Sequence, residues 1–309
     1  MPTSTAFRNA ALIHNPLAGR RPWRRARHLE RVVGLLEAYG IRTTPVVTTG
    51  PGSATELARL EAASGRDLII VWGGDGTVNE VVNGLAGTCV PMALLPAGTA
   101  NVLAKELGLP FDPWRAAEYI PEGEVRQIAL GRAGQRYFVA VAGPGADAQL
   151  IYEIGRRGQP RLGLLSFWLE GFRQLFHYDF RELTVRLGEE VLEGSLVVVS
   201  RTRHYGGPIE ITRRADLFGE DFEVCVFPRR FRLMYLIYFL AQLVGSLDDF
   251  PELRFRRTRL VRAEPRGERV RVQVDGELAG ELPVEFLVIP GALSLLVPRK
   301  ALPRVPEVS

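Results

Sequence analysis

The chain has 309 residues, of which 46% are hydrophobic and 24% are charged, as is typical of a folded, soluble protein with room for two domains. The formal net charge is +4, and 39 residues are basic, so contact with an anionic surface is favoured. No DNA-binding or RNA-binding motif supports a nucleic-acid partner. Two distant cysteines, Cys89 and Cys225, exclude a disulfide framework.

The first half of the chain alternates strand patterns with helix patterns. Strands are expected at 10–14, 42–48, 68–72 and 91–95, and helices at 22–39 and 53–63. This alternation predicts an α/β domain with a parallel sheet, which we place at residues 1–128. Ligands of such sheets bind at the carboxyl ends of the strands. The only apolar run near the N-terminus, at 10–13, is too short for a secretory signal, so we expect a cytoplasmic protein.

A glycine-rich turn follows the strand at 68–72. Its sequence is Gly-Gly-Asp-Gly-Thr at 73–77, and a helix is expected to begin near Val78. Glycines let the backbone approach a ligand closely, and the N-terminus of a helix binds phosphate. Asp75 is the only carboxylate in the turn. Beside a phosphate it implies that a divalent cation or an acceptor hydroxyl lies between the two negative charges.

Three further turns come directly after predicted strands. Asn15 and Pro16, with Gly19 and Arg20 close behind, follow the first strand. Thr48 ends the second strand, and Pro96 to Asn101 follows the fourth. Because the carboxyl ends of parallel strands meet at one edge of a sheet, we expect these turns to form one phosphate site.

Beyond Pro121 the pattern changes to short strands bounded by Gly, Pro or charged turns. Most of them alternate apolar and polar residues, which predicts an all-β sandwich at residues 129–298. Helical stretches at 162–178 and 232–247 interrupt the strands, and the second is too short to span a bilayer comfortably. We expect the tail after Pro298 to be the end of a strand followed by a disordered segment.

These turns resemble the nucleotide-binding signature shared by diacylglycerol kinases, sphingosine kinases and, more distantly, NAD kinases and phosphofructokinases. The Gly-Gly-Asp-Gly-Thr turn, the Asn-Pro turn and the Pro-x-Gly-Thr-x-Asn motif at 96–101 follow the lipid-kinase form. The resemblance covers almost the whole chain. It departs from the family pattern after Asn101, where Val102 to Ala104 replace the usual Asp-Phe-Ala run.

The resemblance implies a lipid kinase that uses ATP and Mg²⁺, with an N-terminal domain like those of NAD kinases and phosphofructokinases. The acceptor is expected to be a hydroxyl of a diacylglycerol-like or sphingoid lipid, reached by peripheral contact with an anionic membrane surface. The resemblance also implies a tail, residues 299–309, that returns to pack on the first domain as the alternative to disorder. A homodimer stays open. The implied nucleotide-binding residues come from the four turns and the helix after the central turn: Asn15, Pro16, Gly19, Arg20, Thr48, Gly73, Gly74, Asp75, Gly76, Thr77, Asn79, Glu80, Gly98, Thr99 and Asn101. Thr49 is the alternative to Thr48 as the threonine that contacts the nucleotide.

Two acidic motifs of the second domain also resemble the family, one at Asp147 and one at Asp275-Gly-Glu277. Phosphoryl transfer needs alignment, charge neutralisation and a carboxylate that accepts the alcohol proton. Bacterial lipid kinases use the last motif for that base, whereas sphingosine kinases use the glycine-turn aspartate. We favour Asp275 as base with Glu277 beside it in sequence, and Asp75 in the Mg²⁺ and phosphate network. An Asp-Gly pair is also a common hairpin signal, so a purely structural turn stays open.

Two departures bear on metal binding and activity. Arg201 stands where the family usually has Asn, in a segment that keeps Tyr205. The Asp-Asp-Gly segment that supplies a metal site in some bacterial members is replaced by Ala-Asp-Leu-Phe-Gly-Glu-Asp at 215–221. Asp75 and Asp216 are therefore the candidate metal ligands, and a second, structural metal stays open. The alternatives to a lipid kinase are an NAD kinase and a catalytically inactive nucleotide-binding or lipid-binding homologue.

Overall fold

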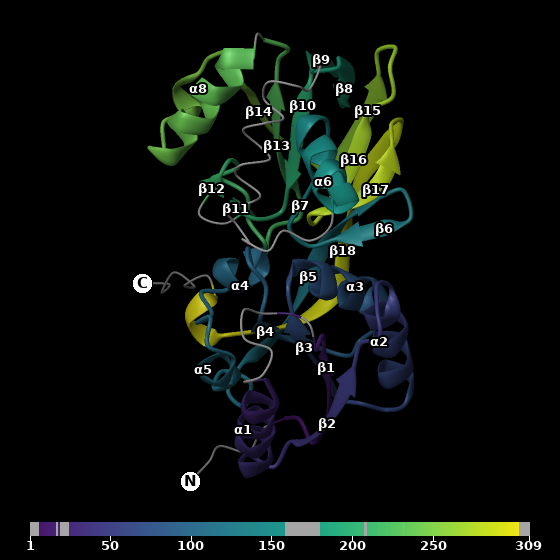
Figure 1. Ribbon diagram of the computed structural model, residues 1–309, viewed down its shortest axis with the longest axis vertical. Helices are drawn as coiled ribbons and strands as arrows, with labels where there is room; N and C mark the ends of the chain where they lie inside the picture. Colours follow the sequence, from purple (N-terminus) through teal and green to yellow (C-terminus); the bar gives the residue numbers. More distant parts are fainter. Residues whose placement is uncertain are drawn as a thin grey trace, which may run out of the picture. The chain divides into compact units, whose positions relative to one another are not determined.

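The computed structural model describes residues 6–16, 18, 25–157, 180–206, 209–230 and 232–302 (Figure 1). The chain divides into two compact units, one of residues 1–128 with 291–309 and the other of residues 129–290. The sequence pattern places 291–298 in the second domain, but the chain re-enters the first unit at Gly291. There the last part of β18 (Val284–Val297) pairs in parallel with β4 (Met92–Pro96) through Leu295 and Met92. None of the helices in the described ranges has the length and apolar character that crossing a bilayer requires.

The first unit is built on a parallel sheet whose strand order is β2-β1-β3-β4. The strands are β1 (Asn9–His14), β2 (Arg42–Val47), β3 (Leu68–Gly73) and β4. Nearly every residue of β1, β3 and β4 is buried, because both faces of the sheet are covered. Such strands appear in a sequence as short, continuous apolar runs. All four predicted strands agree with the observed ones to within about one residue at each end, although β2 is largely exposed.

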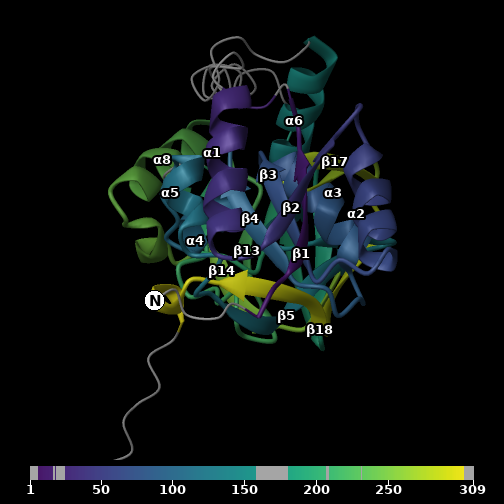
Figure 2. The same ribbon diagram turned by 90° about the horizontal axis from the view of Figure 1, so that it is seen from below.

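Helices cover both faces of this sheet (Figure 2). On one face lie α1 (Arg25–Ala38) and α5 (Pro113–Ala117), whose Val32, Leu36, Ala116 and Ala117 share a core with Leu12, Ile70 and Leu95. On the other face lie α2 (Ser53–Ala63) and α3 (Asp75–Leu85). The connection from β1 to β2 runs along the sheet toward the β2 edge, and the connection from β3 to β4 runs in the opposite direction. Right-handed connections in opposite directions place their helices on opposite faces.

One helix boundary differs from the sequence prediction. We expect α3 to begin near Val78, but it begins at Asp75, with Gly74 extended at the N-cap position. The backbone N–H of Val78 donates to the carbonyl of Gly74 at 3.0 Å, which closes the first helical turn. Gly76 and Thr77 therefore belong to the helix rather than to a turn before it. Residues 19–24, which include the predicted start of α1, lie outside the described residues.

The second unit is a β-sandwich, which confirms the predicted fold class. One layer is an antiparallel sheet in the order β14-β13-β10-β7-β16-β17. Its strands are β7 (Val141–Pro144), β10 (Leu196–Ser200), β13 (Phe222–Phe227), β14 (Arg254–Thr258), β16 (Arg271–Val274) and β17 (Glu277–Glu281). The other layer contains β8 (Leu183–Leu187), β9 (Glu190–Gly194), β15 (Leu260–Pro265) and the first part of β18.

The remaining elements complete the two units. They are α4 (Val102–Glu106), β5 (Glu124–Ala133), β6 (Arg136–Phe138), α6 (Ala146–Arg157), β11 (His204–Gly206), β12 (Ile209–Glu210), α8 (Arg232–Leu243), and the 3₁₀ helices Leu247–Asp249 and Arg299–Ala301. Helix α8 confirms most of the helix expected at 232–247. The helix expected at 162–178 lies outside the described residues.

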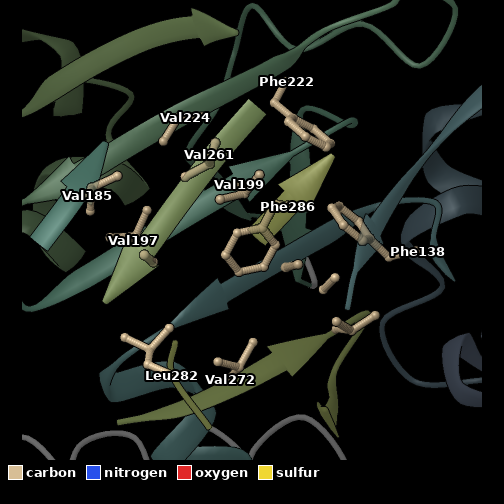
Figure 3. Close-up of a cluster of buried hydrophobic side chains, with 14 of the residues drawn as sticks. Phe138, Val185, Val197, Val199, Phe222, Val224, Val261, Val272, Leu282 and Phe286 are labelled. Atoms are coloured by element: carbon tan, nitrogen blue, oxygen red, sulfur yellow. The ribbon is translucent and has the colours of Figure 1, made fainter. Parts of the chain in front are cut away.

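Three phenylalanines form the centre of the sandwich core (Figure 3). The ring of Phe138 stacks on Phe222 at 5.6 Å between centroids and meets Phe286 edge-on at 6.4 Å. Valines from both layers surround them, including Val199 on β10 and Val261 on β15, as alternation of inward and outward residues requires. The two layers therefore support β7 and β16, the strands that directly precede the acidic motifs at Asp147 and Asp275.

Candidate functional site

The carboxyl ends of the four parallel strands meet at one edge of the first unit. The loops there are tied to neighbouring strands by backbone hydrogen bonds from Asn15 to the Trp72 carbonyl, Thr48 to the His14 carbonyl and Ala97 to the Gly73 carbonyl, at 3.3, 3.0 and 2.9 Å. The direction of the chain connections reverses between β1 and β3. In open α/β sheets a ligand crevice forms at such a reversal, and Asn15 and the glycine turn after β3 both lie there.

The two glycine turns touch each other through their backbones. A Cβ atom added to Gly98 would lie 2.6 Å from the Cα of Gly74, and one added to Gly74 would lie 3.1 Å from the Cα of Gly98. Neither residue has a positive φ. The glycine at position 98 is therefore required by the contact between the two turns. A Cβ at Gly73 would similarly meet Thr77 at 2.5 Å, so that glycine makes room for the first turn of α3.

Asp75 joins the two turns. Its carboxylate accepts hydrogen bonds from the backbone N–H of Asn101 at 2.9 Å and of Val102 at 2.7 Å. Asn101 adopts a left-handed conformation, with φ of 48°. Its side chain accepts from the Gly98 N–H at 2.7 Å and donates to the Gly98 carbonyl at 2.8 Å. Each turn therefore holds the other in place beside the N-terminus of α3, where the backbone favours an anion.

The charge balance at this edge involves a lysine that sequence reasoning missed. Burial raises the pKa of Asp75, against the backbone hydrogen bonds and the charge of Lys105, which lower it. Burial also lowers the pKa of Lys105, and the charge of Asp75 opposes that shift. Lys105 follows Asn101 by four positions and lies on the short helix α4. Residues four positions apart on a helix lie on the same side, so the spacing of Asn101 and Lys105 was the signal that could have linked Lys105 to the turn.

Two predicted nucleotide-binding residues serve other contacts in the structure. The carboxylate of Glu80 accepts from the backbone N–H groups of Gly52 at 2.7 Å and Ala54 at 3.0 Å, so it caps the start of α2. Asn79 is only 1% exposed, and its backbone carbonyl accepts from the side chain of Asn83 at 2.9 Å. These residues stabilise the α2 and α3 pair behind the glycine turn.

The remaining predicted residues lie either at the carboxyl edge of the sheet or outside the described residues. Thr48 is nearly buried at the end of β2, and Thr99 is exposed in the turn after β4, so both lie at the carboxyl edge. Pro16 follows Asn15 at the end of β1. Gly19 and Arg20 lie outside the described residues.

Asp275 occupies a tight hairpin turn in the second unit. It links β16 to β17 with Gly276, and both residues have positive φ, 47° and 83°. Two such residues form a type I′ turn, so the hairpin signal in the sequence is real. The carboxylate also accepts three backbone hydrogen bonds, from Val139 at 2.9 Å, Ala140 at 2.9 Å and Val141 at 3.0 Å. The turn therefore presents a carboxylate whose orientation is fixed.

A chain of polar side chains connects the acidic motif at Asp147 to this turn. Asp147 accepts from the Tyr205 hydroxyl at 2.7 Å and from the Gln273 side chain at 3.1 Å. Gln273 in turn accepts from the backbone N–H of Gly276 at 3.0 Å. Burial raises the pKa of Asp147 to about 6, although these hydrogen bonds oppose the shift. Gln273 was not predicted, and its signal was its place two residues before Asp275.

The other acidic candidates have different partners. Glu277 forms an ion pair with Arg136. Asp216 is exposed, and its carboxylate accepts from the backbone N–H of Phe218 at 2.9 Å. Among the described residues, no three His, Cys, Asp or Glu side chains gather in a group that could hold a metal ion.

Comparison with known proteins covers both units. Residues 9–133 match the model of the diacylglycerol kinase catalytic domain, and residues 140–297 match the YegS C-terminal NAD kinase beta sandwich-like domain. A diacylglycerol kinase of Mycobacterium tuberculosis (strain ATCC 25618 / H37Rv) is 30% identical over 299 residues, covering 92% of this chain and 94% of its own. One of Bacillus subtilis (strain 168) is 28% identical over 299 residues, covering 95% and 98%. A crystal structure of a diacylglycerol kinase from Bacillus anthracis str. Sterne shares the fold, with a TM-score of 0.78, 24% identity and coverage of 96% and 100%.

Proposed function

We propose that this chain transfers the γ-phosphoryl group of ATP to a lipid hydroxyl, because it belongs to the diacylglycerol kinase family and is a lipid kinase. The acceptor would be a diacylglycerol-like or sphingoid lipid at a membrane surface. The observation that carries this proposal is the pair of interlocked glycine turns at the carboxyl edge of the sheet. They lie within the residues that match the catalytic-domain model.

The first unit supplies the nucleotide site in this proposal. The N-terminus of α3 and the backbone of the two turns would bind phosphate oxygens through N–H groups. Mg²⁺ commonly binds proteins through one or two carboxylates together with substrate phosphates. Asp75 fits this role. Burial raises its pKa and so disfavours the charged carboxylate, and a nearby cation would stabilise that charged form. Bound Mg²⁺ would neutralise phosphate charge.

Asp275 is the general base in this proposal. A base must lie in a defined orientation to take the proton of the attacking hydroxyl. Three backbone N–H groups hold the Asp275 carboxylate in one orientation. The ion pair of Glu277 with Arg136 gives that acid a structural role beside the turn.

Helix α8 supports contact with a membrane surface. One side of the helix and its C-terminal extension carries exposed apolar side chains: Leu233 is 57% exposed, Leu240 52%, Leu243 54% and Val244 79%. Tyr235, Tyr238 and Ala241 are buried on the other side. Two exposed arginines, Arg229 and Arg230, precede the helix. An apolar face beside basic residues suits an anionic bilayer, into whose interface it would dip without spanning it.

The basic residues of α1 give weaker support for membrane contact than their sequence suggests. Arg27 is exposed, but the guanidinium of Arg31 stacks over the ring of Trp114 at 4.6 Å. Arg20, Arg21 and Arg24 lie outside the described residues. The membrane proposal therefore depends on α8.

An acceptor panel tests the function. Purified protein is given labelled ATP and Mg²⁺ with one acceptor at a time: vesicles carrying diacylglycerol, vesicles carrying sphingosine, or NAD. Vesicles without an acceptor lipid are the control. We expect labelled lipid and no labelled NAD. Labelling of NAD with every lipid untouched would replace the proposal with an NAD kinase, and folded protein that binds ATP but labels nothing would indicate an inactive homologue.

A further inference from the structure

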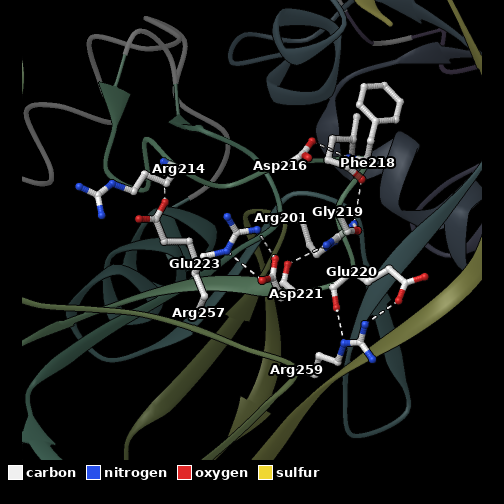
Figure 4. A network of polar contacts seen from close by, with 11 residues as sticks. Arg201, Arg214, Asp216, Phe218, Gly219, Glu220, Asp221, Glu223, Arg257 and Arg259 are labelled. Carbon is white, nitrogen blue, oxygen red and sulfur yellow. Dashed lines mark hydrogen bonds and ion pairs between the residues drawn. The ribbon is translucent and has the colours of Figure 1, made fainter. Parts of the chain in front are cut away.

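Arg201 is a fully buried arginine at the end of β10, with 0% of its surface exposed. Its guanidinium donates hydrogen bonds to the backbone carbonyls of Leu217 at 2.8 Å, Gly219 at 2.7 Å and Asp221 at 2.7 Å (Figure 4). A fourth bond reaches the carbonyl of Ala129 at 3.3 Å. Three carbonyls of one loop, residues 216–221, thus converge on a single positive group.

Converging carbonyl oxygens near acidic side chains are the usual surroundings of a hard metal ion. Here a guanidinium takes that position. Burial lowers the pKa of Arg201 to about 10, while Asp216, Asp221 and Glu220 act in the opposite direction. The side chain is therefore charged at neutral pH, so the cation that the loop surrounds is the Arg201 guanidinium itself.

The acids of the loop are also engaged elsewhere. The carboxylate of Asp221 accepts two hydrogen bonds from Arg257, at 2.8 and 2.7 Å. Glu220 accepts from Arg259 at 2.6 Å through its carboxylate and at 3.0 Å through its backbone carbonyl. A divalent ion would have to displace these partners and would be repelled by the Arg201 guanidinium. The residues present therefore do not fit the second metal that the family segment suggests.

We propose that the Arg201 guanidinium is the resident cation of the 216–221 loop and that this loop binds no structural metal. Asp216 then shapes the loop and has no role as a metal ligand. The inference concerns the second unit alone and does not depend on the proposed kinase activity.

The first experiment uses the wild-type protein without nucleotide. Its Tm is measured in EDTA and in millimolar Mg²⁺ or Ca²⁺, alongside Asp216→Ala in the same buffers. We expect the Tm of the wild type to be the same with and without the metal ion. A rise in Tm with metal that Asp216→Ala abolishes would overturn the proposal.

The second experiment removes the guanidinium. Arg201→Ala leaves buried carbonyls without their donor, so its Tm should fall by about 5 to 15 °C. Arg259→Ala is the matched control, because it removes an exposed arginine that contacts Glu220 of the same loop and should change the Tm by no more than about 2 °C. An Arg201→Ala variant as stable as the control would contradict the proposal. Should Arg201→Ala fail to fold, Arg201→Lys, which keeps the charge with fewer donors, should fold with a lower Tm than the wild type, and the metal response of the wild type still decides.

Discussion

The carboxylate of Asp75 accepts a hydrogen bond from the backbone N–H of Asn101 at 2.9 Å, so the first residue of α3 fixes the turn that follows β4. The two turns are 26 positions apart in the sequence, yet they form one rigid backbone surface. Asp75 thereby combines a structural role with its proposed role beside Mg²⁺. These two roles can be separated by experiment.

Replacing Asp75 by Ala should lower both stability and nucleotide affinity. The variant loses two hydrogen bonds to a carboxylate, each worth about 1.5 to 3 kcal/mol, so the free energy of unfolding should fall by about 3 kcal/mol or more. ATP binding measured by calorimetry should be lost as well. The matched control is Asp67→Ala, because Asp67 also accepts two backbone N–H bonds, from Arg8 at 2.6 Å and Asn9 at 2.9 Å. That control should lose stability and keep its ATP affinity; equal loss of affinity in both would show that Asp75 acts only through stability.

A methyl group at Gly98 should separate the two turns. The added Cβ would lie 2.6 Å from a backbone carbon, so the backbone has to shift, at a typical cost of about 1 to 3 kcal/mol. We expect Gly98→Ala to raise the KM for ATP at least about tenfold, the equivalent of roughly 1.4 kcal/mol of binding. Gly34→Ala on the exposed face of α1, where nothing lies within 4 Å, is the control and should leave KM unchanged. Lost stability with unchanged nucleotide affinity would make Gly98 purely structural.

The raised pKa of Asp147, about 6 in the folded protein against 3.8 for the unperturbed carboxyl, predicts a specific dependence of stability on pH. Between these values the folded state keeps a proton that the unfolded state releases, so stability falls as pH rises and levels off above about 6. The contribution is on the order of 3 kcal/mol.

The measurement is the free energy of unfolding of the wild type and of Asp147→Asn from pH 4 to pH 8. Subtracting the two curves removes the contributions of the other titrating groups. The stability of the variant relative to the wild type should increase with pH up to about 6 to 7 and then remain constant. A difference that is flat across this range would contradict the burial of an ionisable Asp147.

The exposed face of α8 should govern binding to vesicles. Leu240→Glu places a negative charge in the apolar face and should weaken binding to anionic vesicles at least about tenfold, because the cost of burying a charge exceeds 1.4 kcal/mol. Leu60→Glu is the matched control, since Leu60 is 65% exposed on α2. Wild-type binding should also weaken as salt rises. Equal binding by both variants would exclude α8 as the membrane contact.

The sequence predicted the local features of this fold well. Strands β1, β3 and β4 are buried on both faces and therefore appear as apolar runs, and the turns that follow them carry the glycines and Asp75. The Asp275-Gly276 pair was also informative, because a type I′ turn requires positive φ at both positions.

The features that could not be predicted depend on contacts between distant residues. Nothing in the sequence near Gly98 shows that its Cα faces Gly74, or that Arg201 meets carbonyls of residues 217–221. Because Arg201 departs from the family pattern, it suggested a catalytically inactive homologue. In the structure its guanidinium donates hydrogen bonds to backbone carbonyls of residues 217–221. The second unit ends at Pro290, whereas the sequence pattern places the end of the second domain at 298. The reason is that β18 is a single 14-residue strand whose apolar pattern continues through Pro290 into the first unit.

The most direct test is the rate at which label passes from the γ-phosphate of ATP to diacylglycerol in vesicles, for the wild type and for Asp275→Asn. Calorimetric ATP affinity and Tm, measured on the same samples, serve as controls. The wild type should label the lipid, and the variant should do so about 10²-fold more slowly or worse with unchanged ATP affinity, as expected for loss of a general base. A near-normal rate in the variant would assign the base to Asp75. Absence of lipid labelling by folded, ATP-binding wild-type protein would contradict the proposed lipid phosphorylation.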